Sequence, residues 1–300
     1  MVVEGGMTMK NDSRGSKIFD VFNWIFMLFV IFITAYPIYY VVIASISDPG
    51  ALSRTTGALW VPLKPYTTAA YEMVFKDNSV ITGFANTLFV LVIGVIINLI
   101  MTSLGAYFLT VKGPMLKDIV AILIIFTMYF GGGLVPSYLN IKSLGLLNSL
   151  WALILPGAIS TTNLIILKSA FSSVPDSLLE SARLDGASAL HILTKVMVPL
   201  SKATLAVLVL YYGVSHWNSW FGASIYLQDK TKYPLQLVMR NLLNAMNEAQ
   251  VGGVAADEMA QYAEMIKYAL IVVGTAPILV VYPFIQKYFV KGVMVGAVKG

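Results

Sequence analysis

Two kinds of side chain are scarce in this sequence of 300 residues: cysteine is absent, and only 12% of the positions are charged. The lack of cysteine excludes disulfides, thiolate metal sites and cysteine nucleophiles. Soluble domains carry about 25% charged residues, so half that share indicates that most of the surface does not face water. The two histidines, His191 and His216, lie too far apart in sequence to form a metal-ligand motif.

Apolar residues dominate instead. They make up 58% of the chain, and the mean hydropathy is +0.78. The formal net charge of +5 would fit a nucleic-acid partner. However, the basic residues are scattered between apolar runs, and membrane topology explains that distribution better.

Six windows contain no Asp, Glu, Lys or Arg, and each approaches or exceeds the roughly 20 residues that a helix needs to cross a bilayer. They are 21–47, 78–111, 119–141, 143–167, 203–228 and 268–286. A helix satisfies its own backbone hydrogen bonds, which lipid cannot do. We therefore predict an all-α integral membrane protein with six transmembrane helices and both termini on the same side.

The basic residues also predict the orientation of these helices. With the N-terminus inside, 12 of the 20 Lys and Arg residues fall on inside segments and 8 fall outside. No small-residue cleavage site follows a short apolar core, so we do not expect a signal peptide. The expected organisation is a cytoplasmic segment over 1–19, one six-helix membrane domain over 20–290 and a cytoplasmic tail over 291–300. This orientation places 169–202 in the cytoplasm.

Residues 175–199 form the longest polar segment between two strongly apolar ones. Ser177 and Glu180 have capping-box spacing, which predicts the start of a short helix. Gly186 can adopt the left-handed conformation that ends a helix. A second helix is expected over 188–199, so the segment should form an L-shaped elbow of two short helices.

The elbow resembles the conserved cytoplasmic loop of bacterial ABC importer permeases. That family's pattern is Glu-Ala-Ala, three residues, Gly, nine residues and Ile-x-Leu-Pro. This chain has Glu180-Ser181-Ala182, then Gly186, then Val196-Met197-Val198-Pro199 at the same spacing. The substitutions are small or isosteric. An ordinary amphipathic loop helix is the alternative.

The resemblance implies the type I ABC importer permease fold, in which the first helix of the elbow sits in a cleft of the ATPase subunit. The residues implied in docking are Leu178, Leu179, Glu180, Ala182, Arg183, Leu184, Asp185 and Gly186. The sequence contains no Gly-x-x-x-x-Gly-Lys-Ser/Thr phosphate loop, so this chain is not itself the ATPase.

Beyond the elbow, the whole chain looks like the carbohydrate-uptake class of these permeases, the maltose-permease type. Its tail, 296–300, is similar to the Gly-x-Val-Lys-Gly ending of that class. The segments 138–147, 213–219 and 287–292 look like the branch associated with oligo- and polysaccharides.

This class resemblance implies a bacterial cytoplasmic membrane location and alternating access driven by ATP. It also implies three kinds of partner: a second homologous permease, cytoplasmic ATPase subunits and an extracytoplasmic sugar-binding protein. ATP and Mg²⁺ are expected on the ATPase, with no cofactor on this chain.

The fifth window contains an aromatic and polar cluster in its second half. Its candidate substrate-pathway residues are Tyr211, Tyr212, His216, Trp217, Asn218 and Trp220. Aromatic faces beside hydrogen-bonding groups suit a sugar, which offers an apolar ring face and many hydroxyls. The alternative is an interfacial aromatic belt with polar residues that pack helices together. Asn86 and Asn98, in the second window, are expected to bond a neighbouring helix rather than a substrate.

Other functions fit the sequence less well. A secondary transporter usually carries ionisable residues within its spans, and here only His216 could titrate there. An enzyme would need a catalytic constellation, and none converges in the sequence. A structural scaffold does not account for the spaced docking motif. A non-sugar solute remains open on the elbow alone, and the polar segment 229–263 is long enough to reach a partner.

Overall fold

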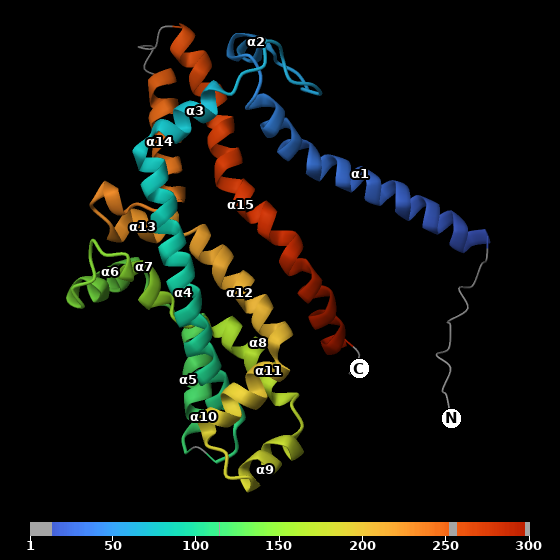
Figure 1. Cartoon of the computed structure of the whole chain (residues 1–300), viewed down its shortest axis with the longest axis vertical. Helices are drawn as coiled ribbons and strands as arrows, with labels where there is room; N and C mark the ends of the chain where they lie inside the picture. The colour runs from blue at the N-terminus through green and yellow to red at the C-terminus, as the bar shows by residue number, and fades with distance from the viewer. Residues whose placement is uncertain (1–13, 114, 252–256, 298–300) are drawn as a thin grey trace. The chain divides into compact units, whose positions relative to one another are not determined.

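The computed structural model describes residues 14–113, 115–251 and 257–297. Every regular element in these ranges is a helix, as Figure 1 shows. The all-α prediction is therefore confirmed. Most of the expected cytoplasmic segment 1–19 and the last three residues of the expected tail lie outside the described residues.

Three described helices are long and apolar enough to cross a bilayer alone. They are α1 (Arg14–Ala44), α4 (Asn78–Thr110) and the part Tyr262–Pro283 of α15 (Asp257–Ala297). At a rise of 1.5 Å per residue, α4 extends about 50 Å, which exceeds the hydrocarbon thickness of about 30 Å. These helices match the first, second and last predicted windows.

Three further candidates are pairs of helices bent at a short break. The α5 (Lys117–Tyr129) and α6 (Leu134–Ser143) pair bends by 119°, and α10 to α11 (Ala189–Leu200) bends by 86° into α12 (Lys202–Trp217). The third pair, Trp151–Gly157 (α7 with η1) and α8 (Thr161–Ser172), bends by 49°. Counting each pair as one span gives up to six spans in the described chain.

The uncharged windows 119–141 and 203–228 are each divided between two helices, and α5 ends at Tyr129, shortly before the glycines 131–133. The helix from the elbow ends at Trp217, and a separate α13 (Trp220–Tyr226) follows. Two side chains explain the end: Asn218 Nδ2 donates to Val214 O at 2.9 Å, and Ser219 Oγ donates to His216 O at 2.8 Å. They satisfy carbonyls that a continuing helix would have used.

The chain folds as two compact units, and the first comprises 14–71 with 257–272. Its core joins the end of α1 to α2 (Pro49–Arg54), which Asp48 caps by accepting from the Ala51 amide. Core residues are Ile43, Ala44, Leu52 and Leu59. Upstream, the apolar membrane window of α1 has no buried residue.

The second unit comprises 72–251 with 273–297, and α4 is its central element. The helices α8, α12 and α14 (Leu235–Val251) pack along it, and Figure 1 shows them beside its length. Near its start, Asn86 Nδ2 donates to Thr231 O, next to η3 (Lys230–Lys232), and Thr87 Oγ1 accepts from the Leu235 amide. Asn98 Nδ2 donates to Gly157 O, so both asparagines bond neighbouring segments as predicted.

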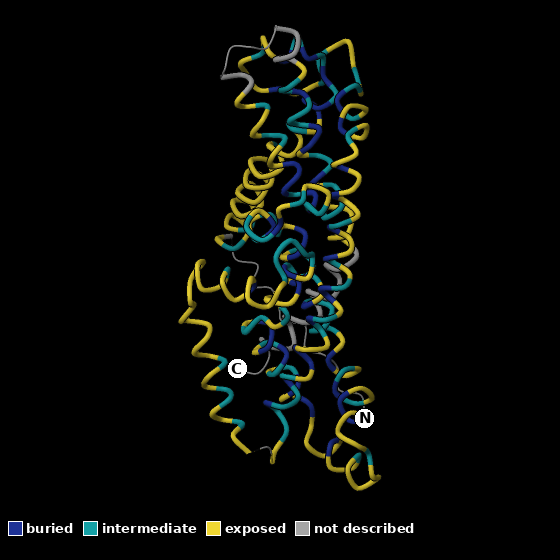
Figure 2. Tube along the Cα trace, turned by 90° about the vertical axis from the view of Figure 1, so that its left-hand side faces the viewer, coloured by how far each residue is buried: buried dark blue, intermediate teal, exposed yellow. Residues whose placement is uncertain are grey.

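The core of this unit extends into the elbow. Its buried residues come from α4, α8, α9 (Asp176–Leu184), α10 to α11 and α12. Much of the remaining chain is exposed, as Figure 2 shows. Exposed apolar side chains on membrane helices are those that face lipid or other subunits.

Candidate functional site

The elbow is present as two short helices joined at a glycine. Its first helix is α9, and Gly186 follows at φ +78°, in the left-handed region. Ser188 then caps the second helix by accepting from the His191 amide at 3.3 Å. The second helix comprises α10 (Ala189–Ile192), η2 (Leu193–Met197) and α11 (Val198–Leu200). Both helices and the turning residue were predicted.

The predicted capping box is wrong. The helix starts at Asp176, directly after Pro175, and no side chain caps it. Ser177 therefore lies inside the first turn, where its hydroxyl is not at the capping position. The positive end of the helix dipole lies at this turn, so the negative charge of Asp176 stabilises the helix.

The two faces of α9 have different environments. Leu179 is only 6% exposed and packs with Phe171 and Val174 in the core of the unit. Ala182 is half-buried against the same core. Leu184, by contrast, is 89% exposed. Thus the predicted docking residues do not all share one surface, because Leu179 and Ala182 hold the helix to its own fold.

The outward face of the elbow combines leucines with charges. Leu178 is 46% exposed and Leu190 is 64% exposed. The charged residues of this face, all exposed, are Glu180, Arg183 and Asp185. An exposed apolar surface rimmed by charges is typical of a protein–protein contact.

An ion pair ties the first turn of α9 to the end of α4. Lys112 Nζ lies 2.6 Å from Asp176 Oδ2. This hydrogen bond and the opposite charge raise the pKa of Lys112 and lower the pKa of Asp176. Both side chains are exposed, so solvent and salt screen the pair.

Three of the six candidate pathway residues are buried and hydrogen-bonded within the second unit. Tyr212 Oη shares a 2.7 Å hydrogen bond with Thr102 Oγ1. His216 Nε2 lies 2.7 Å from Asn98 Oδ1. The Trp217 indole donates to a backbone carbonyl of α15 at 3.0 Å. These contacts fit the packing alternative for Tyr212, His216 and Trp217.

The other three candidates reach the surface to different degrees. Tyr211 is 44% exposed, and Asn218 is exposed. Trp220 is half-buried, and the guanidinium of Arg240 lies 3.6 Å from its ring centroid. That cation covers one face of the indole. The structure therefore does not bring all six residues to one surface.

One exposed residue of the same cluster was not among the six candidates. Ser215 is exposed and lies four residues after Tyr211 and three before Asn218. This spacing places Tyr211 and Ser215 on one face of α12, with Asn218 directly after the helix on the same side. Helical periodicity alone would have separated this face from the buried Tyr212 and His216.

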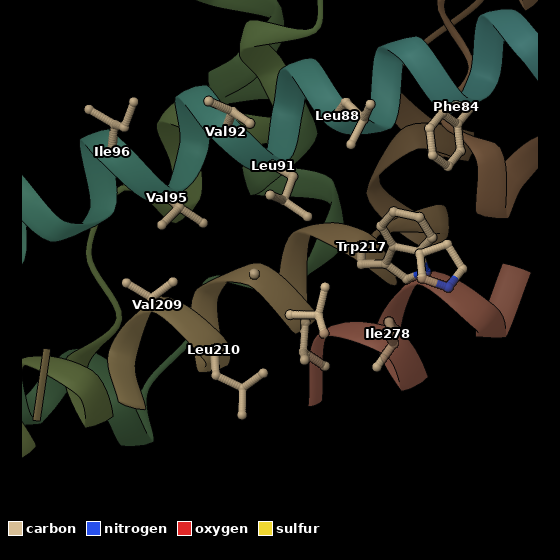
Figure 3. A pocket seen from close by; sticks show the side chains of 14 residues that line it. Phe84, Leu88, Leu91, Val92, Val95, Ile96, Val209, Leu210, Trp217 and Ile278 are labelled. Atoms are coloured by element: carbon tan, nitrogen blue, oxygen red, sulfur yellow. The ribbon is translucent and has the colours of Figure 1, made fainter. Parts of the chain in front are cut away.

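An apolar groove lies between α4, α12 and α15 in the second unit, with a volume of about 440 Å³. Figure 3 shows Leu88, Leu91 and Val95 of α4 pointing toward α12, with Phe84 beside Trp217 at one end. Only apolar residues and glycine line the groove, so it offers no side-chain partners for sugar hydroxyls. Within the described residues, no group of three or more His, Asp or Glu is placed to hold a metal ion.

Comparison with known proteins identifies the family to which this chain belongs. The family model "Binding-protein-dependent transport system inner membrane component" matches residues 114–295. Protein LplC of Bacillus subtilis (strain 168) is 38% identical over 293 residues, which cover 98% of each chain. The polygalacturonan/rhamnogalacturonan transport system permease protein YtcP of the same organism is 38% identical over 289 residues, covering 95% of this chain and 99% of that one.

A solved structure gives the same result for the fold. One chain of a bacterial ABC transporter involved in the import of the acidic polysaccharide alginate superposes with a TM-score of 0.84. It is 34% identical and covers 92% of this chain and 98% of its own. The chain therefore belongs to the binding-protein-dependent transport system inner membrane components, and it is the multi-pass membrane permease of an ABC importer rather than the ATPase.

Proposed function

We propose that this permease carries oligo- or polysaccharides across the membrane by alternating access, driven by ATP hydrolysis on separate subunits. The observation that supports this substrate class is the near full-length similarity to YtcP, whose name specifies polygalacturonan and rhamnogalacturonan, and to the importer chain whose description specifies the acidic polysaccharide alginate. A permease for a non-sugar solute is the alternative.

The elbow is the docking element for the ATPase in this proposal. Leu178, Leu184 and Leu190 are exposed, whereas other apolar residues of the elbow are buried in the core. Complete burial of a leucine is worth about 1.5–3 kcal/mol, so a partner groove that covers these side chains gains binding energy. A short amphipathic helix in a groove is a common recognition mode. The charges of Glu180 and Arg183 then lie at the rim of the contact.

The exposed face of α12 is the best candidate for sugar contact. Tyr211 offers an aromatic ring on which a sugar can stack, and Ser215 and Asn218 offer hydrogen-bonding groups on the same face. This replaces the wider set of six residues, because Tyr212, His216 and Trp217 already bond within the unit.

The proposal includes the subunits that complete the transporter. They are a second homologous permease, cytoplasmic ATPase subunits that bind ATP and Mg²⁺, and an extracytoplasmic sugar-binding protein. The segment 20–290 forms the membrane domain, with 1–19 and 291–300 in the cytoplasm. A single cysteine at Ser172 tests this orientation, because the chain has no other cysteine. An impermeant thiol reagent should label it only from the cytoplasmic side, and labelling from outside in sealed cells would contradict the orientation.

The substrate test uses the assembled transporter in vesicles with its binding protein. Acidic oligosaccharides such as oligogalacturonides or alginate oligomers should stimulate ATP hydrolysis and accumulate inside. Neutral oligosaccharides, amino acids and peptides serve as comparison solutes. Stimulation by amino acids or peptides, with none by any oligosaccharide, would refute the proposed substrate class and favour the alternative.

A further inference from the structure

The break between η1 (Leu155–Gly157) and α8 leaves backbone groups without partners in their own helices, and side chains of other helices bond two of these groups. They are the carbonyl of Gly157 and the amide of Ser160. Inside a bilayer such groups cost several kcal/mol unless protein groups replace the lost bonds. Side chains of two neighbouring helices do so: Asn98 Nδ2 donates to Gly157 O at 2.6 Å, and Tyr212 Oη accepts from the Ser160 amide at 3.0 Å.

The side chains that reach the break are also bonded to each other across α4 and α12. Asn98 pairs with His216 at 2.7 Å, and Thr102 pairs with Tyr212 at 2.7 Å. All four side chains are buried. Because the amide nitrogen of Asn98 is used by the break, its oxygen accepts from His216 Nε2. We name this set of four residues the polar clamp.

The two hydrogen-bonded pairs of the clamp follow the spacing expected for two antiparallel helices. Moving four residues forward on α4, from Asn98 to Thr102, corresponds to moving four residues back on α12, from His216 to Tyr212. Residues four apart lie on one helix face, one turn from each other. Each of the two pairs holds one backbone group of the break. The break is therefore bonded at both of its ends to the same two helices.

Two features connect the clamp to the functional surfaces. Tyr212 belongs to the same buried core as Leu179 of the elbow and Leu167 and Phe171 of α8. On the other side, Tyr212 and His216 directly follow Tyr211 and Ser215 in the chain. The elbow and the exposed face of α12 are thus linked by one packed core and one hydrogen-bonded network.

We propose that Asn98, Thr102, Tyr212 and His216 are positioning residues for transport. They keep the bend between η1 and α8 fixed, so that α4, α8, α12 and α9 move as one rigid body when the ATPase moves the elbow. The break is then a pinned bend and not a hinge. The part that concerns the exposed face of α12 rests on the proposed sugar contact there, whereas the rigid bend does not.

A distance measurement tests the rigid bend in the assembled transporter. Spin labels at Leu155→Cys and Ser172→Cys lie before and after the break, and the chain contains no other cysteine. The partner subunits are used in cysteine-free form. Pulsed electron–electron double resonance should give the same label distance without nucleotide and with trapped ATP. A change of distance between these two states would overturn the proposal, whatever the transported solute.

A conservative variant tests the clamp itself. Tyr212→Phe keeps the ring but removes the hydroxyl that holds both Ser160 and Thr102, so the distance distribution should broaden. Solute transported per ATP hydrolysed should fall roughly three- to eighteenfold, the range expected from a hydrogen bond between membrane helices. Thr102→Val removes one link only and should give a smaller fall. An unchanged distribution and an unchanged transport ratio in Tyr212→Phe would refute the role.

Thr87→Val is the matched control, because it removes a buried threonine hydroxyl from α4, the helix that also carries Thr102. Thr87 is not part of the polar clamp. Thr87 accepts from the Leu235 amide at 2.8 Å and has no bond to the break. Its variant should lose thermal stability to a similar degree as Thr102→Val but keep the transport ratio. An equal fall of the ratio in both variants would show a general effect of weakening α4 and would overturn the proposal.

Discussion

Replacing Gly186 gives the sharpest test of the elbow, because the cost can be worked out from one backbone angle. Its φ is +78°, and a Cβ placed there would meet no atom within 4 Å. The penalty of a side chain is therefore conformational and not steric crowding. An L-residue in this region costs about 1–2 kcal/mol, asparagine is tolerated better, and a β-branched residue fits worst.

A cost of 1–2 kcal/mol shifts the equilibrium of the turn by a factor of about 5–30 but is small beside a typical folding free energy of about 5–15 kcal/mol. We therefore expect membrane insertion and assembly to persist in all variants. Binding-protein-stimulated ATP hydrolysis and uptake in vesicles should fall in the order Gly186→Asn, Gly186→Ala, Gly186→Val, with the asparagine variant closest to wild type. Equal activity of the asparagine and valine variants would refute the argument that the left-handed turn is what coupling requires.

Three further predictions concern the elbow and α12. Glu180→Lys should leave insertion intact and lower stimulated ATP hydrolysis, because it reverses a charge on the outward face of α9; wild-type stimulation would contradict docking there. Tyr211→Ala should reduce uptake about two- to tenfold, since a stacking contact is worth about 0.5–1.5 kcal/mol. Trp217→Phe, by contrast, should lower the free energy of unfolding by about 0.6 kcal/mol through loss of its hydrogen bond and leave the half-saturating sugar concentration unchanged. The opposite pattern would make Trp217 the sugar contact. Asp176→Asn should lower the thermal midpoint slightly across neutral pH. Because the pKa of Asp176 is lowered, the ion pair with Lys112 contributes its full stability at pH values above the ordinary carboxyl pKa of 3.8. Because the pKa of Lys112 is raised, that contribution is also complete at pH values below the ordinary amine pKa of 10.5. The difference from wild type should vanish at low pH, as the pH falls through the lowered pKa of Asp176, and at high pH, as the pH rises through the raised pKa of Lys112. A difference that vanished near neutral pH would contradict this assignment.

The features that the sequence predicted well are those with a local physical signal. Long uncharged windows gave α1, α4 and the last span, because the length of an apolar run directly reflects the thickness of the bilayer. The elbow turn was also local, since Gly186 supplies the conformation that ends α9.

The features that were missed depend on contacts between distant residues. The end of α12 at Trp217 depends on side chains that bond back to its last turn, within an apolar stretch that reads as continuous. The burial of Leu179 depends on Phe171 and other residues of the core, so its apolar character alone did not tell which partner it would face. Likewise, helical periodicity puts Tyr211 and Tyr212 on different faces of α12, but which of the two faces is buried depends on packing.

The close approach of α4 and α12 has a consequence for how this chain can change over evolution. A Cβ added at Gly94 would lie 2.5 Å from His216 Nε2, which is closer than real Cβ contacts occur. Alanine at 94 is therefore unfavourable while His216 is present and becomes acceptable once a small residue stands at 216. Losing His216 first, however, leaves the buried Asn98 oxygen without its partner, at a cost of about 1–3 kcal/mol. Each substitution is costly alone and less costly with its companion, so the two positions are expected to change together among relatives, with non-additive free energies in a double-mutant cycle.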